Sequence, residues 1–287
     1  PNMIREAHRR DIPVSLINGR VSDSSFKGYM KVRFLMRQIL ELINPLCMQG
    51  RQDAERMIAM GARPEAVKTL GTAKYDLPPP DASAAAAAQA VLKQAGVSDN
   101  ALILLGGSTW PGEEDVLCKI YKTLREKQPE LFLVLVPRHA ERRAEVVAAV
   151  EGQGLSYTLR SQLGDAASVQ SDVLIVDTTG ELMSFYAAVD LVFVGKSLCE
   201  NGGQNPIEPA LFGKPIVVGP NMENFPSVMD DFFSAKALRQ VDDAEALELV
   251  LGDLIAEETA RAQLGNAAAK LVESHRGVVS EMVKEIC

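Results

Sequence analysis

The segment GGQNPIEPALFGKPIVVGPNMENF, residues 202–225, decides how we interpret this sequence. It follows an apolar run, DLVFVG at residues 190–195, and contains a second one, KPIVVGP at residues 214–220; both are typical of buried strands. Between them, Asn205 is expected to cap a helix, and Glu208 lies three residues past the cap. The order of strand, Gly-bearing loop, helix and strand indicates a parallel α/β sheet with a nucleotide-sugar pocket.

The composition is that of a soluble globular protein. The 287 residues can form one large core or two modest ones, since 47% are hydrophobic and 24% are charged. The formal net charge of −8 argues against nucleic-acid binding, which requires a basic surface. Two basic stretches, residues 8–10 and 27–37, leave a weak attraction to membranes open, although a solvated helix face explains each one alone.

The cysteines and histidines predict no metal site and no cofactor. Cys47, Cys118, Cys199 and Cys287 form no CxxC pair, and the three histidines are scattered. Cys47 and Cys118 lie in apolar surroundings and are expected to be buried thiols in a reducing compartment. No window approaches the ~18–20 apolar residues that a membrane-spanning helix needs, so we expect a soluble chain.

Apolar runs predict two α/β series. The first has strands at residues 13–18, 45–49 and 67–70 and helices at 26–43 and 51–60. The second has strands at 101–106, 131–137, 155–159, 172–177, 190–195 and 214–220, with helices at 113–127, 140–150, 181–188, 206–212 and 225–233. Two helices, at 244–254 and 257–286, close the chain, and the second is expected to break near Gly277.

These series predict two domains. Residues 1–76 open on a helix pattern and a strand, so we expect the remainder of a first, acceptor-side domain that lacks its leading strands. Residues 77–95 are expected to be a linker and helix start, because prolines halt the preceding element and an alanine run favours helix. Residues 96–287 then form the nucleotide-sugar domain with its closing helices.

Glycine, hydroxyl, amide and charged residues follow five strands of the second series. They lie at residues 106–109, 138–139, 178–181, 196–205 and 221–224. Each group has a structural alternative: a Gly-Ser turn, a surface pair at Arg138 and His139, or a capping box between Thr178 and Glu181. Because parallel strands deliver their carboxyl ends to one edge, the concurrence indicates an anionic, polyhydroxylated ligand. No nucleophile elbow appears, and His139 fits phosphate binding better than general-base chemistry.

Several segments resemble the 3-deoxy-D-manno-octulosonic acid (Kdo) transferase family of GT-B glycosyltransferases. They are PNMIREAHRRDIPVSLINGRVSDSSFKGY (1–29), QDAERMIAMGA (52–62), GTAKYD (71–76), VPRHAER (136–142), DTTGELMSFYAAVDLVFVGKSL (177–198) and residues 202–225. They run in the family's order over most of the chain, and the last two are highly specific. The resemblance implies a GT-B-like α/β fold of two Rossmann-type parallel-sheet domains, the first incomplete.

The resemblance also implies a reaction: inverting, metal-independent transfer of Kdo from CMP-Kdo to lipid A precursor (lipid IVA) in lipopolysaccharide biosynthesis. The implied donor-binding residues are Gly107, Ser108, Thr109, Arg138, His139, Gly180, Glu181, Met183, Gly203, Asn205 and Glu208. The family's acidic base belongs to a segment before Pro1, so the resemblance identifies no catalytic residue here. That preceding part is expected to hold the full-length protein at the cytoplasmic face of the inner membrane.

Three hypotheses stay open. The first is a Kdo transferase, the second a catalytically incomplete CMP-sugar-binding module, and the third another GT-B enzyme such as a nucleotide-sugar 2-epimerase, for which we find no acid/base residues. One departure concerns Lys196: the family tends to have Gly-Gly where this chain has Gly195 and Lys196. Lys196 either adds a phosphate contact or is a surface replacement, and we favour the surface interpretation.

Overall fold

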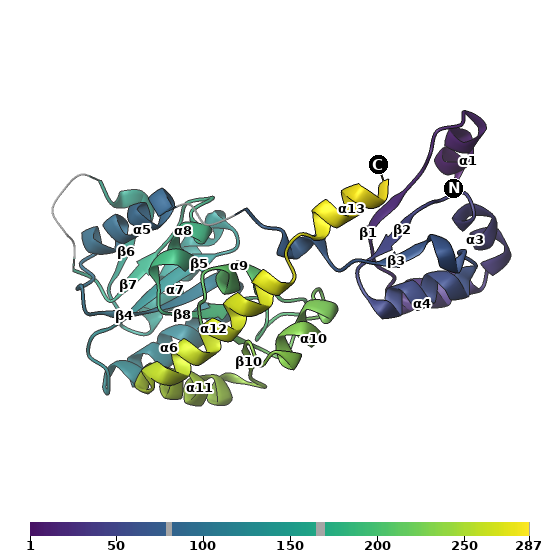
Figure 1. Cartoon of the computed structure of the whole chain (residues 1–287). Coiled ribbons are helices and arrows are strands. Elements are labelled where there is room, and N and C mark those ends of the chain that lie inside the picture. The colour runs from purple at the N-terminus through teal and green to yellow at the C-terminus, as the bar shows by residue number, and fades with distance from the viewer. Residues whose placement is uncertain (79–81, 165–169, 287) are drawn as a thin grey trace. The chain divides into compact units, whose positions relative to one another are not determined.

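The computed structural model describes residues 1–78, 82–164 and 170–286, which divide into two compact units. Unit 1 comprises Pro1–Leu77 together with the residues from His275 onward, and unit 2 comprises Pro78–Ser274. Each unit has its own parallel sheet with helices packed against it (Figure 1). The α/β class that the sequence predicts is therefore confirmed.

Unit 1 is built on a three-stranded parallel sheet in the order β1-β2-β3. Its elements are α1 (Asn2–Arg9), β1 (Leu16–Gly19), α2 (Asp23–Met30), α3 (Arg33–Leu40), β2 (Leu46–Met48), α4 (Arg51–Met60), β3 (Val67–Thr69) and α13 (Val278–Ile286), with 3₁₀ turns at Pro64–Ala66 and Ala73–Tyr75. The single helix predicted over residues 26–43 is two helices. Its apolar residues surround the helix axis instead of forming one stripe, so a single helix could not bury them all; Tyr29 and Phe34 remain exposed.

The central strand β2 is fully buried because both of its faces are covered. Leu46 and Met48 pack with Met57 of α4 on one face. Cys47 points to the other face, where it packs with Val278 and Met282 of α13. The C-terminal helix thus supplies the second layer of unit 1, whereas the sequence analysis placed all of residues 96–287 in the second domain.

Asp76 fixes the start of α13. Its two carboxylate oxygens accept hydrogen bonds from the backbone N–H groups of Gly277 and Val279, each at 2.5 Å. Gly277 has a φ of +96°, which lets the chain turn between α12 (Glu258–Ser274) and α13. The predicted helix break near Gly277 is therefore confirmed.

Unit 2 is a seven-stranded parallel sheet in the order β10-β9-β8-β4-β5-β7-β6. Its strands are β4 (Leu102–Thr109), β5 (Leu131–Pro137), β6 (Tyr157–Leu159), β7 (Val173–Ile175), β8 (Leu191–Val194), β9 (Ile216–Val218) and β10 (Arg239–Gln240). Its helices are α5 (Ala82–Gln94), α6 (Glu113–Arg125), α7 (Arg143–Gly152), α8 (Leu182–Ala188), α9 (Ile207–Leu211), α10 (Pro226–Ser234), α11 (Ala244–Ala256) and α12, with 3₁₀ turns at Ala140–Arg142 and Arg160–Gln162. All six predicted strands are present, and among the strands in the described part of unit 2 the sequence did not predict β10.

Helices cover both faces of this sheet (Figure 1). On one face, Leu104 and Leu133 join a buried cluster with Leu117 and Tyr121 of α6. On the other face, α8 packs with α5 and α9 and contacts β4. The strands are continuously apolar because each is buried on both sides, which is why sequence inspection finds them.

We expect Asp76→Ala to loosen α13. The substitution removes the acceptor for two backbone N–H groups at the helix start, and loss of such a cap costs about 1 kcal/mol. Amide hydrogen exchange in α13 should accelerate, and chemical denaturation should show a lower free energy of unfolding. Asp76→Asn keeps one acceptor oxygen and should have a smaller effect; unchanged exchange in Asp76→Ala would show that Asp76 does not fix the helix.

Candidate functional site

The strand order of unit 2 reverses direction between β4 and β8. The chain passes from β4 to β5 on one side through α6, whereas β7 reaches β8 on the other side of β4 through α8. Such a reversal leaves a crevice at the carboxyl ends of the strands, where open parallel sheets bind ligands. The loops that follow β4 and β8 are therefore the centre of the candidate site.

Two consecutive glycines allow helices to approach β4 from opposite sides. A Cβ on Gly106 would lie 2.6 Å from Cδ1 of Leu117 in α6, and one on Gly107 would lie 2.5 Å from Oη of Tyr186 in α8. The sequence predicted that the strand ends at residue 106, but it continues to Thr109, with a bulge between Gly107 and Thr109. Gly107 thus lies within the strand, and its role in packing was not anticipated.

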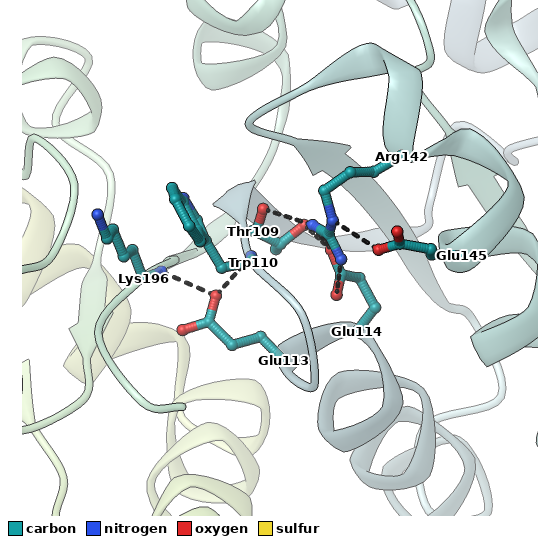
Figure 2. Close-up of polar contacts among 7 residues, drawn as sticks. All are labelled: Thr109, Trp110, Glu113, Glu114, Arg142, Glu145 and Lys196. Carbon is teal, nitrogen blue, oxygen red and sulfur yellow. Dashed lines mark hydrogen bonds and ion pairs between the residues drawn. The ribbon is translucent and has the colours of Figure 1, made fainter. Parts of the chain in front are cut away.

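A buried carboxylate joins the loops after β4 and β8. Glu113, the first residue of α6, is fully buried. Its Oε2 accepts from the backbone N–H groups of Trp110 (2.9 Å) and Lys196 (2.8 Å), as Figure 2 shows. Its Oε1 accepts from those of Ser197 (2.9 Å) and Leu198 (3.0 Å). Burial raises the pKa of Glu113, and the four N–H donors oppose that rise because each stabilises the carboxylate.

The neighbouring carboxylate, Glu114, fixes the end of β4 to the start of α7 (Figure 2). It accepts from the Thr109 hydroxyl at 2.7 Å and from two guanidinium nitrogens of Arg142 at 2.9 and 3.2 Å. Arg142 also donates to the Thr109 carbonyl (3.1 Å) and to Glu145 (3.0 Å). The Thr109 hydroxyl, expected to face a ligand, is fully buried and bonded to Glu114.

Lys196, in the loop after β8, contacts Trp110, in the loop after β4. The Lys196 ammonium lies 4.1 Å from the centre of the Trp110 ring, a cation–π contact (Figure 2). The His139 ring packs edge-on against the same indole at 5.7 Å. Gly203, with a φ of +70°, donates its backbone N–H to the Lys196 carbonyl at 2.8 Å. The predicted site residues His139 and Gly203 thus both lie next to Trp110 or Lys196.

Asn205 and Glu208 are bonded to each other at the start of α9. The Asn205 amide donates to Oε1 of Glu208 at 3.2 Å, and its Oδ1 accepts from the Ile207 N–H at 3.2 Å. The helix begins at Ile207 and Pro206 is its cap residue, so Asn205 caps the helix from one position further out than predicted.

Glu208 belongs to one electrostatic neighbourhood with Arg138 and Tyr186. Burial raises the pKa of Glu208, while the Asn205 hydrogen bond and the positive charge of Arg138 oppose that rise. Burial and the Glu208 carboxylate together raise the pKa of the fully buried Tyr186 well above its ordinary value. Since Tyr186 also contacts Gly107, four predicted site residues (Gly107, Arg138, Asn205 and Glu208) lie together.

The loop after β7 is arranged differently from the predicted capping box. Helix α8 begins one residue after Glu181, so Thr178 is too far from it to cap it; its hydroxyl donates instead to the Glu181 carboxylate. Glu181 also accepts from Arg160 at 3.0 and 3.1 Å. Gly180 is exposed with a φ of +85°, and Met183 is half-buried in α8. The Glu181 carboxylate therefore bonds to Thr178 and Arg160, and not to Asn205 or Glu208.

Sequence reasoning missed the residues that build the crevice: Trp110, Glu113, Glu114, Arg142 and Tyr186. Acidic residues in a first helical turn are ordinary on a protein surface, since they complement the helix dipole. Nothing in the order of the residues shows that Glu113 is buried. Tyr186 could have been suspected from the sequence, because a glycine in a buried strand leaves space that a large side chain from a neighbouring helix can fill.

The match to known proteins first defines the class. Residues 106–271, more than half of the chain, match the family described as Glycosyl transferases group 1, and the fold is GT-B-like. Within that class, residues 1–77 match the family described as 3-Deoxy-D-manno-octulosonic-acid transferase (kdotransferase). The chain belongs to the Kdo transferase family of GT-B glycosyltransferases.

Individual relatives agree with this assignment. The 3-deoxy-D-manno-octulosonic acid transferase of Haemophilus influenzae is 29% identical over 99% of this chain and 66% of its own length. The crystal structure of the C-terminal CMP-Kdo binding domain of WaaA from Acinetobacter baumannii is 29% identical, with a TM-score of 0.61 over 67% of this chain and 99% of that domain. Anabaena HepE in complex with UDP is 15% identical, with a TM-score of 0.61 over 99% of this chain, and shows the fold alone.

The chain spans about two thirds or less of the length of the curated relatives that it matches. None of the helices in the described ranges is long and apolar enough to cross a bilayer. Residues 1–78, 82–164 and 170–286 contain no group of three or more His, Cys, Asp or Glu side chains that could hold a metal ion.

We expect Glu113→Ala to destabilise unit 2. The substitution leaves four backbone N–H groups without their acceptor, so the free energy of unfolding should fall by about 3 kcal/mol. Urea unfolding followed by the fluorescence of Trp110 measures this. Glu126→Ala removes an exposed carboxylate just past the same helix and should change stability by less than about 0.5 kcal/mol. Equal effects of the two substitutions would contradict the bridging role of Glu113.

Proposed function

We propose that this chain belongs to an enzyme that transfers Kdo from CMP-Kdo to lipid A precursor, with inversion and without a metal, and that unit 2 binds the donor. The observation that carries the proposal is the coincidence of two things. About 67% of this chain aligns with 99% of a CMP-Kdo binding domain, and the loops at the switch point of unit 2 carry cationic, amide and carboxylate groups.

The proposed donor contacts divide by chemistry. Arg138 and His139 are exposed at the end of β5, where positive charge can neutralise the CMP phosphate as it leaves. Asn205 and Glu208 offer amide and carboxylate groups to the hydroxyls of the nucleotide. The further proposed contacts are Gly107, Ser108, Gly180, Glu181, Met183 and Gly203. Thr109 supports this set indirectly, through Glu114.

A second function has one observation in its favour. The grouping of Arg138, Asn205 and Glu208 is equally consistent with a CMP-sugar-binding module that binds the donor without transferring the sugar. We propose the acceptor, the membrane surface and the catalytic base for a protein of the relatives' length. Calorimetric titration with CMP and CMP-Kdo, followed by a transfer assay with lipid A precursor, separates the two. Binding of neither nucleotide would exclude both functions.

We expect Glu208→Ala to weaken CMP binding about tenfold or more, because a hydrogen bond to a charged group contributes roughly 1.5–3 kcal/mol. Calorimetry measures the dissociation constant. Glu200→Ala is the matched control, since Glu200 is an exposed carboxylate of the loop that leads to α9, and it should bind CMP as the unsubstituted chain does. Equal affinities of the two variants would place the nucleotide elsewhere.

We also expect CMP affinity to fall on acidification partly through Glu208. Its pKa is raised, so the carboxylate is protonated at a higher pH than an ordinary glutamate and stops accepting hydrogen bonds. The effect on folding has the opposite sign. In the chain without nucleotide, the free energy of unfolding decreases as the pH rises from the ordinary glutamate pKa through the raised pKa of Glu208, because the folded chain disfavours the ionised carboxylate.

The measurement is the CMP dissociation constant from pH 8 to about pH 5, compared with that of Glu208→Gln. The CMP phosphate titrates near pH 6 in both proteins, so its contribution cancels in the comparison. The pH dependence should be shallower in Glu208→Gln. Parallel profiles would show that the protonation of Glu208 does not control binding.

A further inference from the structure

We propose that Lys196 is an anion-binding residue of the crevice, which contacts the phosphate or the sugar carboxylate of the nucleotide sugar. The inference rests on the proposed donor site and adds a residue that the resemblance does not supply. It also reverses the interpretation of Lys196 as a surface replacement.

The position of Lys196 is the first step. It follows β8 after a single residue, Gly195, whose N–H donates to the Gly107 carbonyl at 2.8 Å, so it lies at the switch point. Its φ is +56°, in the left-handed region that residues with a side chain rarely adopt. On the neighbouring strand, Ser108 has a φ of +53°. Unfavourable backbone conformations that face each other are typical of ligand sites, where the surrounding structure maintains them.

The backbone of Lys196 is held on both sides. Its N–H donates to Glu113, and its carbonyl accepts from Gly203. The direction in which the side chain leaves the loop is therefore set by the fold. An ammonium group directed in this way needs less ordering when a ligand binds than one on a free surface.

The ammonium itself has an aromatic neighbour but no carboxylate. It lies over the Trp110 ring at 4.1 Å, and no carboxylate within the described ranges lies in ion-pair distance of it. The two acidic side chains of the facing loop are bonded to other groups: Glu113 to four backbone N–H groups and Glu114 to Arg142. A ring face attracts positive charge but accepts no ordinary hydrogen bond. The three N–H donors of Lys196 thus remain available to an anion.

Trp110 adds a second unfavourable feature beside the left-handed backbone of Lys196. Its Nε1 is buried without a hydrogen-bond partner in the part of the chain that the structure describes. An unsatisfied buried donor is unfavourable, as is the backbone of Lys196. The unpaired Trp110 N–H and the left-handed backbone of Lys196 occur at one place, where the indole contacts both Lys196 and His139. These features lower the stability of the fold, and they place an ammonium group where an anion can bind it.

The experiment titrates the full chain and its Lys196→Met variant with cytidine, CMP and CMP-Kdo by calorimetry. Methionine keeps an apolar stem against Trp110 and removes the charge. We expect unchanged cytidine affinity and about tenfold weaker binding of CMP if the anion is the phosphate, because one charge-assisted hydrogen bond is lost. If the anion is the sugar carboxylate, CMP binding stays the same and CMP-Kdo binding weakens by a similar factor. Lys196→Arg should retain most of the affinity.

A spectroscopic readout is available because Trp110 is the only tryptophan of the chain. CMP or CMP-Kdo should change its fluorescence in the unsubstituted chain, and less so in Lys196→Met. The ionic-strength dependence of binding should also be weaker in that variant, because one fewer charge interacts with the ligand. Lys119→Met removes an exposed ammonium from α6 and should change none of these properties.

Equal affinity of the chain and Lys196→Met for all three ligands would overturn the inference and leave the donor site intact. The same weakening for cytidine as for CMP would also overturn it, because it would show a structural role. Failure of the unsubstituted chain to bind CMP and CMP-Kdo would overturn both the inference and the proposed function. Thermal unfolding of each variant confirms that folded proteins are compared.

Discussion

Four backbone N–H groups from two loops converge on the carboxylate of Glu113, and the arrangement of the loops after β4 and β8 depends on this convergence. The loops leave the β-ladder at its carboxyl edge, so their N–H groups lose their strand partners while remaining buried. Buried backbone donors must be paired, and a single carboxylate pairs four of them. Gly195 must then be a glycine, because a Cβ there would lie 2.8 Å from Glu113 and 2.5 Å from the Ser108 carbonyl.

Charge is separated within this small region. Glu113 and Glu114 at the start of α6 point inward, where backbone N–H groups and Arg142 compensate their charges. The cationic side chains of Arg138 and Lys196 lie just after the ends of β5 and β8. A chain with a formal net charge of −8 can therefore present a locally positive surface to an anionic ligand. The overall charge argues against nucleic-acid binding, but it does not determine the local charge around the loops after β5 and β8.

The sequence predicted the elements of unit 2 well, because its strands are continuous apolar runs buried on both faces. It left two explanations open where a local pattern has more than one physical cause. The Gly106–Gly107 pair resembles a phosphate loop, yet it allows two helices to approach a strand. Thr178 and Glu181 have capping-box spacing, yet only their side chains bond. The burial of Glu113 depends on a loop that follows it by more than eighty residues, and no local pattern records that contact.

The two-sided burial of β2 has a consequence for the order in which the protein is made. One face of that strand packs with α4, whereas the face that carries Cys47 packs with Val278 and Met282 of α13 and with Leu70. A ribosome delivers β2 early and α13 late, after the whole of unit 2 has emerged. Unit 2 is continuous in sequence and can fold during synthesis. Unit 1, whose strands precede unit 2 in this chain, therefore completes its core only after α13 has been made, and until then the Cys47 face of β2 lacks the cover that this helix provides.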